Sequence, residues 1–249
     1  MSFERMVSTN LFVRKGQLPA SRTFWEEGLG IPLGRAAESL LTFYLGDNTQ
    51  LNIHESTPSS EALTARHTGL GLRVPAPGDL ARITQRLQSR GITVTSGQIR
   101  DFMSSQSLTL TGPAGNTICL FESEEFSDQP HMFDAPAFVV VSVSNMRRSL
   151  DFYVGRLEMP MLDQIDQHTV RLLTEGTQLI LCERKGTSPT TPVSGDTGIC
   201  LGVSDPEYAF GQLSGRGVAF QNTPTILGNT MLASVSDPDG NTLNLMGTI

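Results

Sequence analysis

The sequence predicts an α+β fold made of four modules, each with the order strand–helix–strand–strand–strand, arranged as two tandem domains. Two near-identical segments of turn and strand, residues 112–120 and 237–245, lie 125 residues apart. A second set of residues recurs at an offset of 128. It comprises Ser21, Phe24, Trp25, Leu29, Ile31 and Pro32, which recur as Ser149, Phe152, Tyr153, Leu157, Met159 and Pro160. A nearly constant offset of this length indicates duplicated domains rather than a short structural repeat.

The length of the chain agrees with two domains. At 249 residues it is long enough for two halves that each bury a core of their own. We predict a first domain at residues 1–124, a linker at 125–136 and a second domain at 137–249. The predicted linker is acidic, contains prolines and has no apolar periodicity, as is typical of a domain boundary.

The first half contains two of the predicted modules. A strand at residues 6–13 precedes a helix at 18–28, where Pro19 suits the first turn and Phe24 and Trp25 supply a buried face. Further predicted elements of this half are strands at 40–45, 49–55 and 69–74, a helix at 79–89, and strands at 92–98, 107–111 and 117–122.

The second half repeats this order. The predicted elements are a strand at 138–143, a helix at 146–156, strands near Met161 and at 170–174 and 178–183, a strand at 198–203, a helix at 206–214, and strands to Met246. One module leaves an open, curved sheet, and pairing two modules closes a cleft in which a ligand can bind. We therefore expect curved mixed sheets with helices on their outer faces.

Composition excludes several classes of partner. A net charge of −7 argues against non-specific binding to nucleic acid or to anionic membranes, which depends on clustered Lys and Arg. The sequence shows neither an apolar run long enough to span a membrane nor a secretory signal. The three cysteines, Cys119, Cys182 and Cys200, suit a reducing compartment. These features predict a cytoplasmic protein. The predicted cleft favours a small-molecule ligand as the partner, and because both modules of each cleft lie in one chain, we expect a monomer or a homodimer, with no dimer required.

The four modules, the helix Ser149-Leu150-Asp151-Phe152-Tyr153 and the turn Asp237-Pro238-Asp239-Gly240-Asn241 together resemble the vicinal oxygen chelate superfamily. This group includes glyoxalase I, extradiol dioxygenases, and fosfomycin and bleomycin resistance proteins. The resemblance implies two tandem glyoxalase-like domains and a cleft that binds a small organic molecule. In most enzymes of the family, His and Glu side chains hold one divalent metal in that cleft.

The residues at the corresponding positions of this chain do not form such a metal site. The resemblance places the ligand positions at Ser8, Gly69 and Cys119 in the first half, and at Phe138, Gly198 and Asn244 in the second half. Glycine and phenylalanine side chains cannot coordinate a metal, and one cysteine is not a zinc site. We therefore expect no metal cofactor.

Other residues are candidates for a site in the cleft. His54 and His67 are the candidate catalytic residues, because histidine can carry a proton near neutral pH. The candidate ligand-binding residues are Ser8, Asn10, Asn52, Arg73, Cys119, Phe138, Arg171 and Asn244. Leu51 and Ile53 should face the helices, which leaves Asn52 and His54 on the opposite face of their strand.

Three hypotheses for function follow. The first is a metal-independent protein that binds a small organic molecule, similar to the bleomycin-resistance type. The second is a metal-independent lyase or isomerase that acts on a carbonyl or enol-like molecule, with His54 or His67 as proton carrier. The third is a metal enzyme of lyase, isomerase or dioxygenase type with displaced ligands, in which His54 and His67 act with Glu55 or Glu122.

Overall fold

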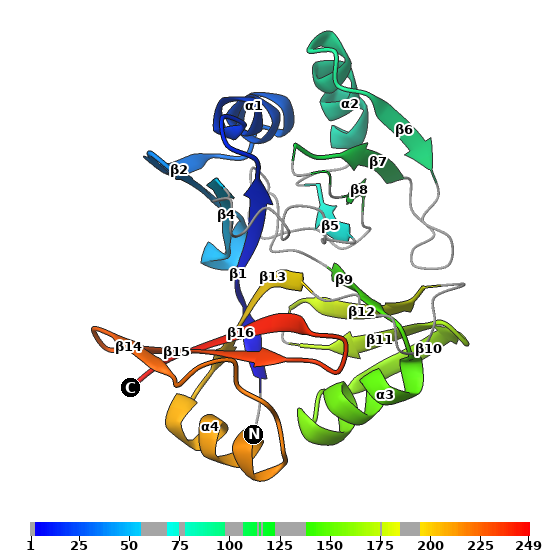
Figure 1. Cartoon of the computed structure of the whole chain (residues 1–249). Helices are drawn as coiled ribbons and strands as arrows, with labels where there is room; N and C mark the ends of the chain where they lie inside the picture. The colour runs from blue at the N-terminus through cyan, green and yellow to red at the C-terminus, as the bar shows by residue number, and fades with distance from the viewer. Residues whose placement is uncertain are drawn as a thin grey trace. The chain divides into compact units, whose positions relative to one another are not determined.

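The structure, a computed structural model, describes residues 3–55, 69–74, 78–97, 107–113, 115, 117–122, 138–174, 176–184 and 195–249. The chain divides into two compact units. The first combines Met1–Thr9 with Val140–Ile249, and the second is Asn10–Val139. Figure 1 labels most of the helices and strands of both units.

The second unit contains two modules. In one, β1 (Phe3–Val13) leads to α1 (Leu18–Arg22), η1 (Thr23–Leu29), β2 (Leu33–Ala37), β3 (Leu40–Tyr44), the short helix η2 (Gly46–Asn48) and β4 (Gln50–Glu55), with the strand order β1-β4-β3-β2. In the other, β5 (Gly69–Arg73) leads to α2 (Asp79–Ser89), β6 (Val94–Gly97), β7 (Ser107–Thr111) and β8 (Thr117–Phe121), with the order β5-β8-β7-β6. Strands β5 and β8 pair in parallel, whereas β8 with β7 and β7 with β6 pair antiparallel.

The first unit repeats this pattern. One module runs from β9 (Phe138–Val143) through α3 (Met146–Leu150), η4 (Asp151–Arg156), β10 (Met161–Asp166), β11 (Thr169–Leu173) and β12 (Gln178–Glu183). The other comprises β13 (Gly195–Val203), α4 (Pro206–Gly215), β14 (Thr225–Leu227), β15 (Thr230–Ser236) and β16 (Asn241–Thr248). The predicted α+β class and the four modules are therefore confirmed.

Strand β1 belongs to both units. Its first residues pair antiparallel with β13, with Ser8 opposite Cys200 and Thr9 opposite Ile199. Residues 1–9 therefore lie in the unit formed by the second half of the chain. This pairing could not be predicted, because a strand that pairs with a partner so distant in the chain leaves no local pattern in the sequence.

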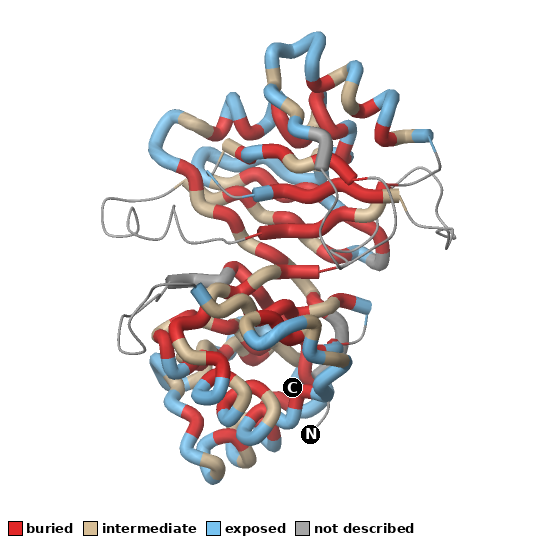
Figure 2. The backbone as a smooth tube through the Cα atoms, turned by 90° about the vertical axis from the view of Figure 1, so that its right-hand side faces the viewer, coloured by how far each residue is buried: buried red, intermediate tan, exposed pale blue. Residues whose placement is uncertain are grey.

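The helices bury the apolar faces that the sequence indicated. In α2, Leu80, Ile83 and Leu87 are buried at helical spacing. The two predicted helices at 18–28 and 146–156 are each an α-helical turn followed by a π-helical segment. Paired aromatic rings recur in both halves, with centroids 5.1 Å apart in Phe24–Trp25 and in Phe152–Tyr153. The buried residues follow the strands and the inner sides of the helices, while the helices' outer sides are exposed (Figure 2).

The repeated turn that revealed the duplication has the same geometry in both halves. Gly115 and Gly240 adopt φ angles of +76° and +81°, which residues other than glycine rarely reach. Each donates its N–H to a carbonyl three residues earlier, at 2.8 Å to Gly112 and 3.0 Å to Asp237.

No helix in the described part of the chain is long and apolar enough to cross a membrane.

Candidate functional site

Polar side chains gather on one face of β1, β3 and β4 in the second unit. The Thr42 hydroxyl donates to Oδ1 of Asn52 at 2.9 Å, and Nδ2 of Asn52 donates to Oδ1 of Asn10 at 3.1 Å. Nε2 of His54 lies 3.1 Å from the same Asn10 oxygen. The Phe12 ring stacks on His54 with centroids 5.3 Å apart. We call these five residues the His54 cluster.

Strand alternation places this cluster. Leu51 and Ile53 are fully buried on the face of β4 against which α1 lies, and Asn52 and His54 occupy the opposite face. Leu41 and Phe43 are buried in the same way, so Thr42 joins Asn52 directly across the strands. Asn52 and His54 therefore share one face of β4, as expected from strand alternation, and Asn10 of β1 contacts both. The sequence prediction missed Phe12 and Thr42, although Thr42 is a single polar residue between Leu41 and Phe43.

Burial controls the charge of His54. Because its ring is half-buried, desolvation disfavours the charged form and lowers the pKa of His54 below its ordinary value. His54 is therefore neutral at pH 7, and a neutral imidazole has one nitrogen that can accept a proton or a hydrogen bond.

We expect this burial to make the protein less stable in mild acid. A histidine with a depressed pKa binds fewer protons in the folded than in the unfolded state, so its contribution to the unfolding free energy is lost as pH falls below about 6.5. Urea unfolding at pH 8 and pH 5 measures this loss. The His54→Gln variant should show a smaller difference between the two pH values, and an unchanged difference would contradict the assignment.

Two carboxylates proposed as metal ligands have structural roles. Glu122 accepts hydrogen bonds from the backbone N–H groups of Gly78 at 2.8 Å and Leu80 at 3.3 Å, at the start of α2. Glu55 accepts from the N–H of Gly16, just before α1. Glu122 therefore caps the beginning of α2, whereas Glu55 holds the turn that precedes α1. The displaced metal site stays a hypothesis, because His67 lies outside the described residues.

Ser8 and Asn244 lie in one row of the first unit. Ser8 is opposite Cys200, Cys200 is opposite Asn244, and Asn244 is opposite Ser234. The Ser234 hydroxyl donates to Oδ1 of Asn244 at 2.7 Å. Gly198 lies on β13, two residues before Cys200. The structure thus places two predicted ligand-binding residues on the two strands that flank β13, but their hydroxyl and amide groups are neutral.

The ring of Phe138 fills the space beside Gly71 of β5, which is paired with Cys119 of β8. Gly71 lies opposite Cys119, and a Cβ atom at Gly71 would be 2.2 Å from the Phe138 ring. Phe138 also stacks on Phe121, with ring centroids 6.0 Å apart. Burial raises the pKa of the Cys119 thiol to about 12, so it is not a nucleophile at neutral pH. Gly69, at the start of the same β5, is buried as well.

The two candidate arginines lie on different strands. Arg171 of β11 is bound by Asp163 of β10, with Nε donating to Oδ1 at 2.7 Å and a terminal nitrogen donating to Oδ2. This hydrogen bond raises the pKa of Arg171 and lowers the pKa of Asp163. Arg73 is half-buried at the end of β5, opposite Phe121. The planar fork predicted to bind a ligand at Arg171 therefore already holds a carboxylate.

The donor groups of the His54 cluster do not fit the family's divalent metal. A catalytic zinc or iron site needs three protein ligands, chiefly His, Cys or carboxylates. Within the described residues no three His, Cys, Asp or Glu side chains lie close enough to hold a metal ion. The cluster itself offers one imidazole, and its amide oxygens accept hydrogen bonds from neighbours.

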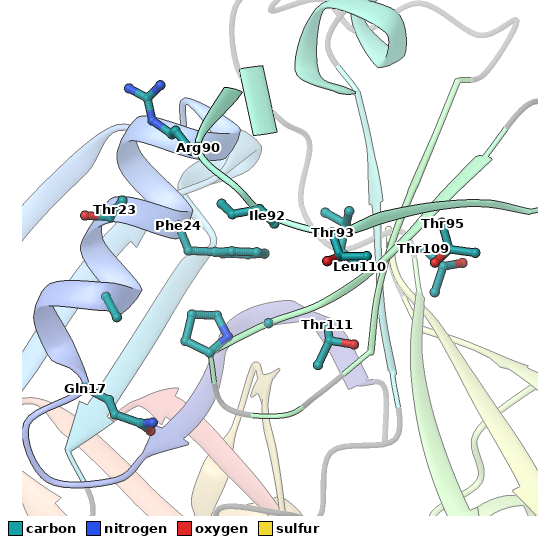
Figure 3. A pocket seen from close by; sticks show the side chains of 13 residues that line it. Gln17, Thr23, Phe24, Arg90, Ile92, Thr93, Thr95, Thr109, Leu110 and Thr111 are labelled. Carbon is teal, nitrogen blue, oxygen red and sulfur yellow. The ribbon is translucent and has the colours of Figure 1, made fainter. Parts of the chain in front are cut away.

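A separate pocket of about 610 Å³ lies between α1–η1 and strands β6 and β7 (Figure 3). Phe24 and Ile92 extend into the space between the helix and the strands, and Arg90 lies at the helix side. Threonines line much of the pocket, namely Thr23, Thr93, Thr95, Thr109 and Thr111. The sequence prediction named none of these residues, although Thr93, Thr95, Thr109 and Thr111 alternate as residues on one face of a strand do.

The chain belongs to the Glyoxalase/Bleomycin resistance protein/Dioxygenase superfamily, whose model matches residues 6–120 and 135–245. This confirms the resemblance seen in the sequence. Among solved structures, the chain is similar to a putative dioxygenase from Bacillus subtilis, with a TM-score of 0.73 and 12% identity over 99% of this chain and 86% of that one. It is also similar to glyoxalase I from Zea mays, with a TM-score of 0.71 and 18% identity over 98% of this chain and 92% of that one. At these identities the likeness shows the fold alone. No curated protein matches the chain significantly.

Proposed function

We propose that the chain binds a small organic molecule at the His54 cluster, without the divalent metal that the family resemblance implies. The observation that carries this proposal is a mutually hydrogen-bonded set of polar side chains, in which Asn10, Asn52 and His54 are half-buried, beside an aromatic ring on the sheet face opposite α1. Ligand sites typically combine apolar surface with a few fixed polar groups, and groups held before binding lose little entropy when the ligand arrives.

A second candidate function is acid–base catalysis at the same cluster on a carbonyl or enol-like molecule. The lowered pKa of His54 favours it, because a neutral imidazole at pH 7 can take a proton from a bound substrate. Binding alone and catalysis differ in one observable. A ligand that is recovered unchanged supports binding, and a ligand that is converted supports catalysis.

A thermal-shift screen of small organic molecules, followed by titration of any hit, tests the location of the site. We expect Asn52→Ala and His54→Ala to weaken binding about tenfold, because each removes a polar partner of the ligand or of the cluster. The control is Thr93→Trp, which obstructs the pocket of Figure 3 and leaves the His54 cluster intact. A hit that loses affinity only in Thr93→Trp would place the ligand in that pocket and refute the proposal.

Metal analysis of protein purified without a chelator tests whether the chain works without a divalent metal. We expect no stoichiometric divalent metal. A stoichiometric metal that disappears in the His54→Ala/His67→Ala double variant would overturn the metal-independent proposal and support the hypothesis of a displaced metal site.

A further inference from the structure

We propose that Asn10 holds His54 in the tautomer protonated at Nε2, so that Nδ1 accepts a hydrogen bond from an O–H or N–H group of the ligand. This inference rests on the proposed function, because it assigns the chemical class of the molecule bound at the His54 cluster. It makes Asn10 a positioning residue, which acts on the ligand through His54.

The direction of the hydrogen bonds leads to this assignment. The Thr42 hydroxyl donates to Oδ1 of Asn52, so the Asn52 amide presents its N–H₂ group to Asn10. Oδ1 of Asn10 accepts that hydrogen bond at 3.1 Å and lies 3.1 Å from Nε2 of His54. A carbonyl oxygen can only accept a hydrogen bond. Nε2 of His54 must therefore carry the proton and donate it to Oδ1 of Asn10.

The other ring nitrogen then has a lone pair. A neutral imidazole carries one proton, and burial keeps His54 neutral. Among the described residues, no hydrogen bond to Nδ1 is formed, and the Phe12 ring covers one face of the imidazole. The half-buried ring is partly desolvated, so a ligand that supplies a donor to Nδ1 gains from this contact.

The consequence is a selection by hydrogen-bonding group. Alcohols, phenols and amides can donate to Nδ1, whereas ethers, esters and ketones without a donor cannot. The same geometry means that, in any reaction at this cluster, His54 must first act as a base through Nδ1. A proton would pass from the ligand to Nδ1, the electron pair would stay on the ligand, and the resulting imidazolium would keep its Nε2–H bond to Asn10.

Nitrogen-15 NMR of protein labelled at histidine tests the tautomer directly, with the His54 signals identified by their loss in His54→Gln. At pH 8 we expect the protonated-nitrogen signal at Nε2 and the bare-nitrogen signal at Nδ1. Asn10→Ala should remove this preference and give a mixture of tautomers, while Ser8→Ala, on the same strand, should leave it unchanged. A proton on Nδ1 in the unmodified protein, or a tautomer indifferent to Asn10→Ala, would overturn the inference.

Titration with phenol and with its methyl ether, anisole, tests the ligand class on the same signals. We expect phenol to move the Nδ1 resonance and anisole to leave it in place. An equal response to both probes would refute selection for a donor. The predicted tautomer with no response to phenol would refute binding at the cluster while leaving the role of Asn10 intact, so the two failures are distinguishable.

Discussion

The Asp239→Ala variant should lose about 3 kcal/mol of unfolding free energy, because it removes the acceptor for a set of buried donors. The Asp239 side chain is fully buried. It accepts from the backbone N–H of Ser144 at 2.9 Å, from the Ser144 hydroxyl and from Arg148. These contacts attach the turn between β15 and β16 to the end of β9. Without the carboxylate, the N–H and hydroxyl of buried Ser144 lose this acceptor, and a buried donor that loses its acceptor is costly.

The measurement should report on the unit that contains the turn. The single tryptophan, Trp25, lies in the other unit, so hydrogen exchange of peptides from β9, β15 and β16 is the better probe. The matched control is Asp151→Ala. Asp151 pairs with Arg156 at 3.2 Å on an exposed surface, and its loss should change stability by no more than about 0.5 kcal/mol. Equal effects of the two variants would contradict a structural role for Asp239.

Features that recur along the chain could be predicted from the sequence. The duplicated turn, the helices with their paired aromatic residues and the alternation in β4 are local patterns repeated at a nearly constant offset. They sufficed to predict the four modules and to place Asn52 and His54 together on one face. The turn itself is set by glycine in a left-handed conformation in both halves, so its geometry follows from the residue type.

Features that depend on distant partners could not be predicted. Asp239 and Ser144 are 95 residues apart, and no periodicity connects them. The hydrogen bonds of Glu55 and Glu122 were also hidden, because a glutamate at a strand end does not show which backbone N–H group it will meet. The position of the segment that follows β1 or β5 decides this: Glu55 meets the turn before α1, and Glu122 meets the start of α2. A candidate site is therefore predictable where strand alternation defines it, and not where a loop or helix end supplies the partner.

The second large effect is expected at Gly71. A methyl group added there would lie 2.2 Å from Cε1 and 2.3 Å from Cζ of Phe138, well inside van der Waals contact. Phe138 is buried and stacks on Phe121, so its ring cannot move aside freely. We expect Gly71→Ala to destabilise the protein by about 2–3 kcal/mol through overpacking. Urea unfolding followed by fluorescence of Trp25, which lies in the same unit, measures the change.

A double-mutant cycle separates this steric conflict from a loss of backbone freedom. Phe138→Ala alone should cost about 3–4 kcal/mol because it leaves a cavity. In the Gly71→Ala/Phe138→Ala double variant the new methyl group enters that cavity, so the combined loss should be smaller than the sum by about 1–2 kcal/mol. Gly211→Ala in α4, where no atom lies within 4 Å of the added carbon, should not destabilise. Additive losses at Gly71 and Phe138 would show that the ring does not fill the space above Gly71.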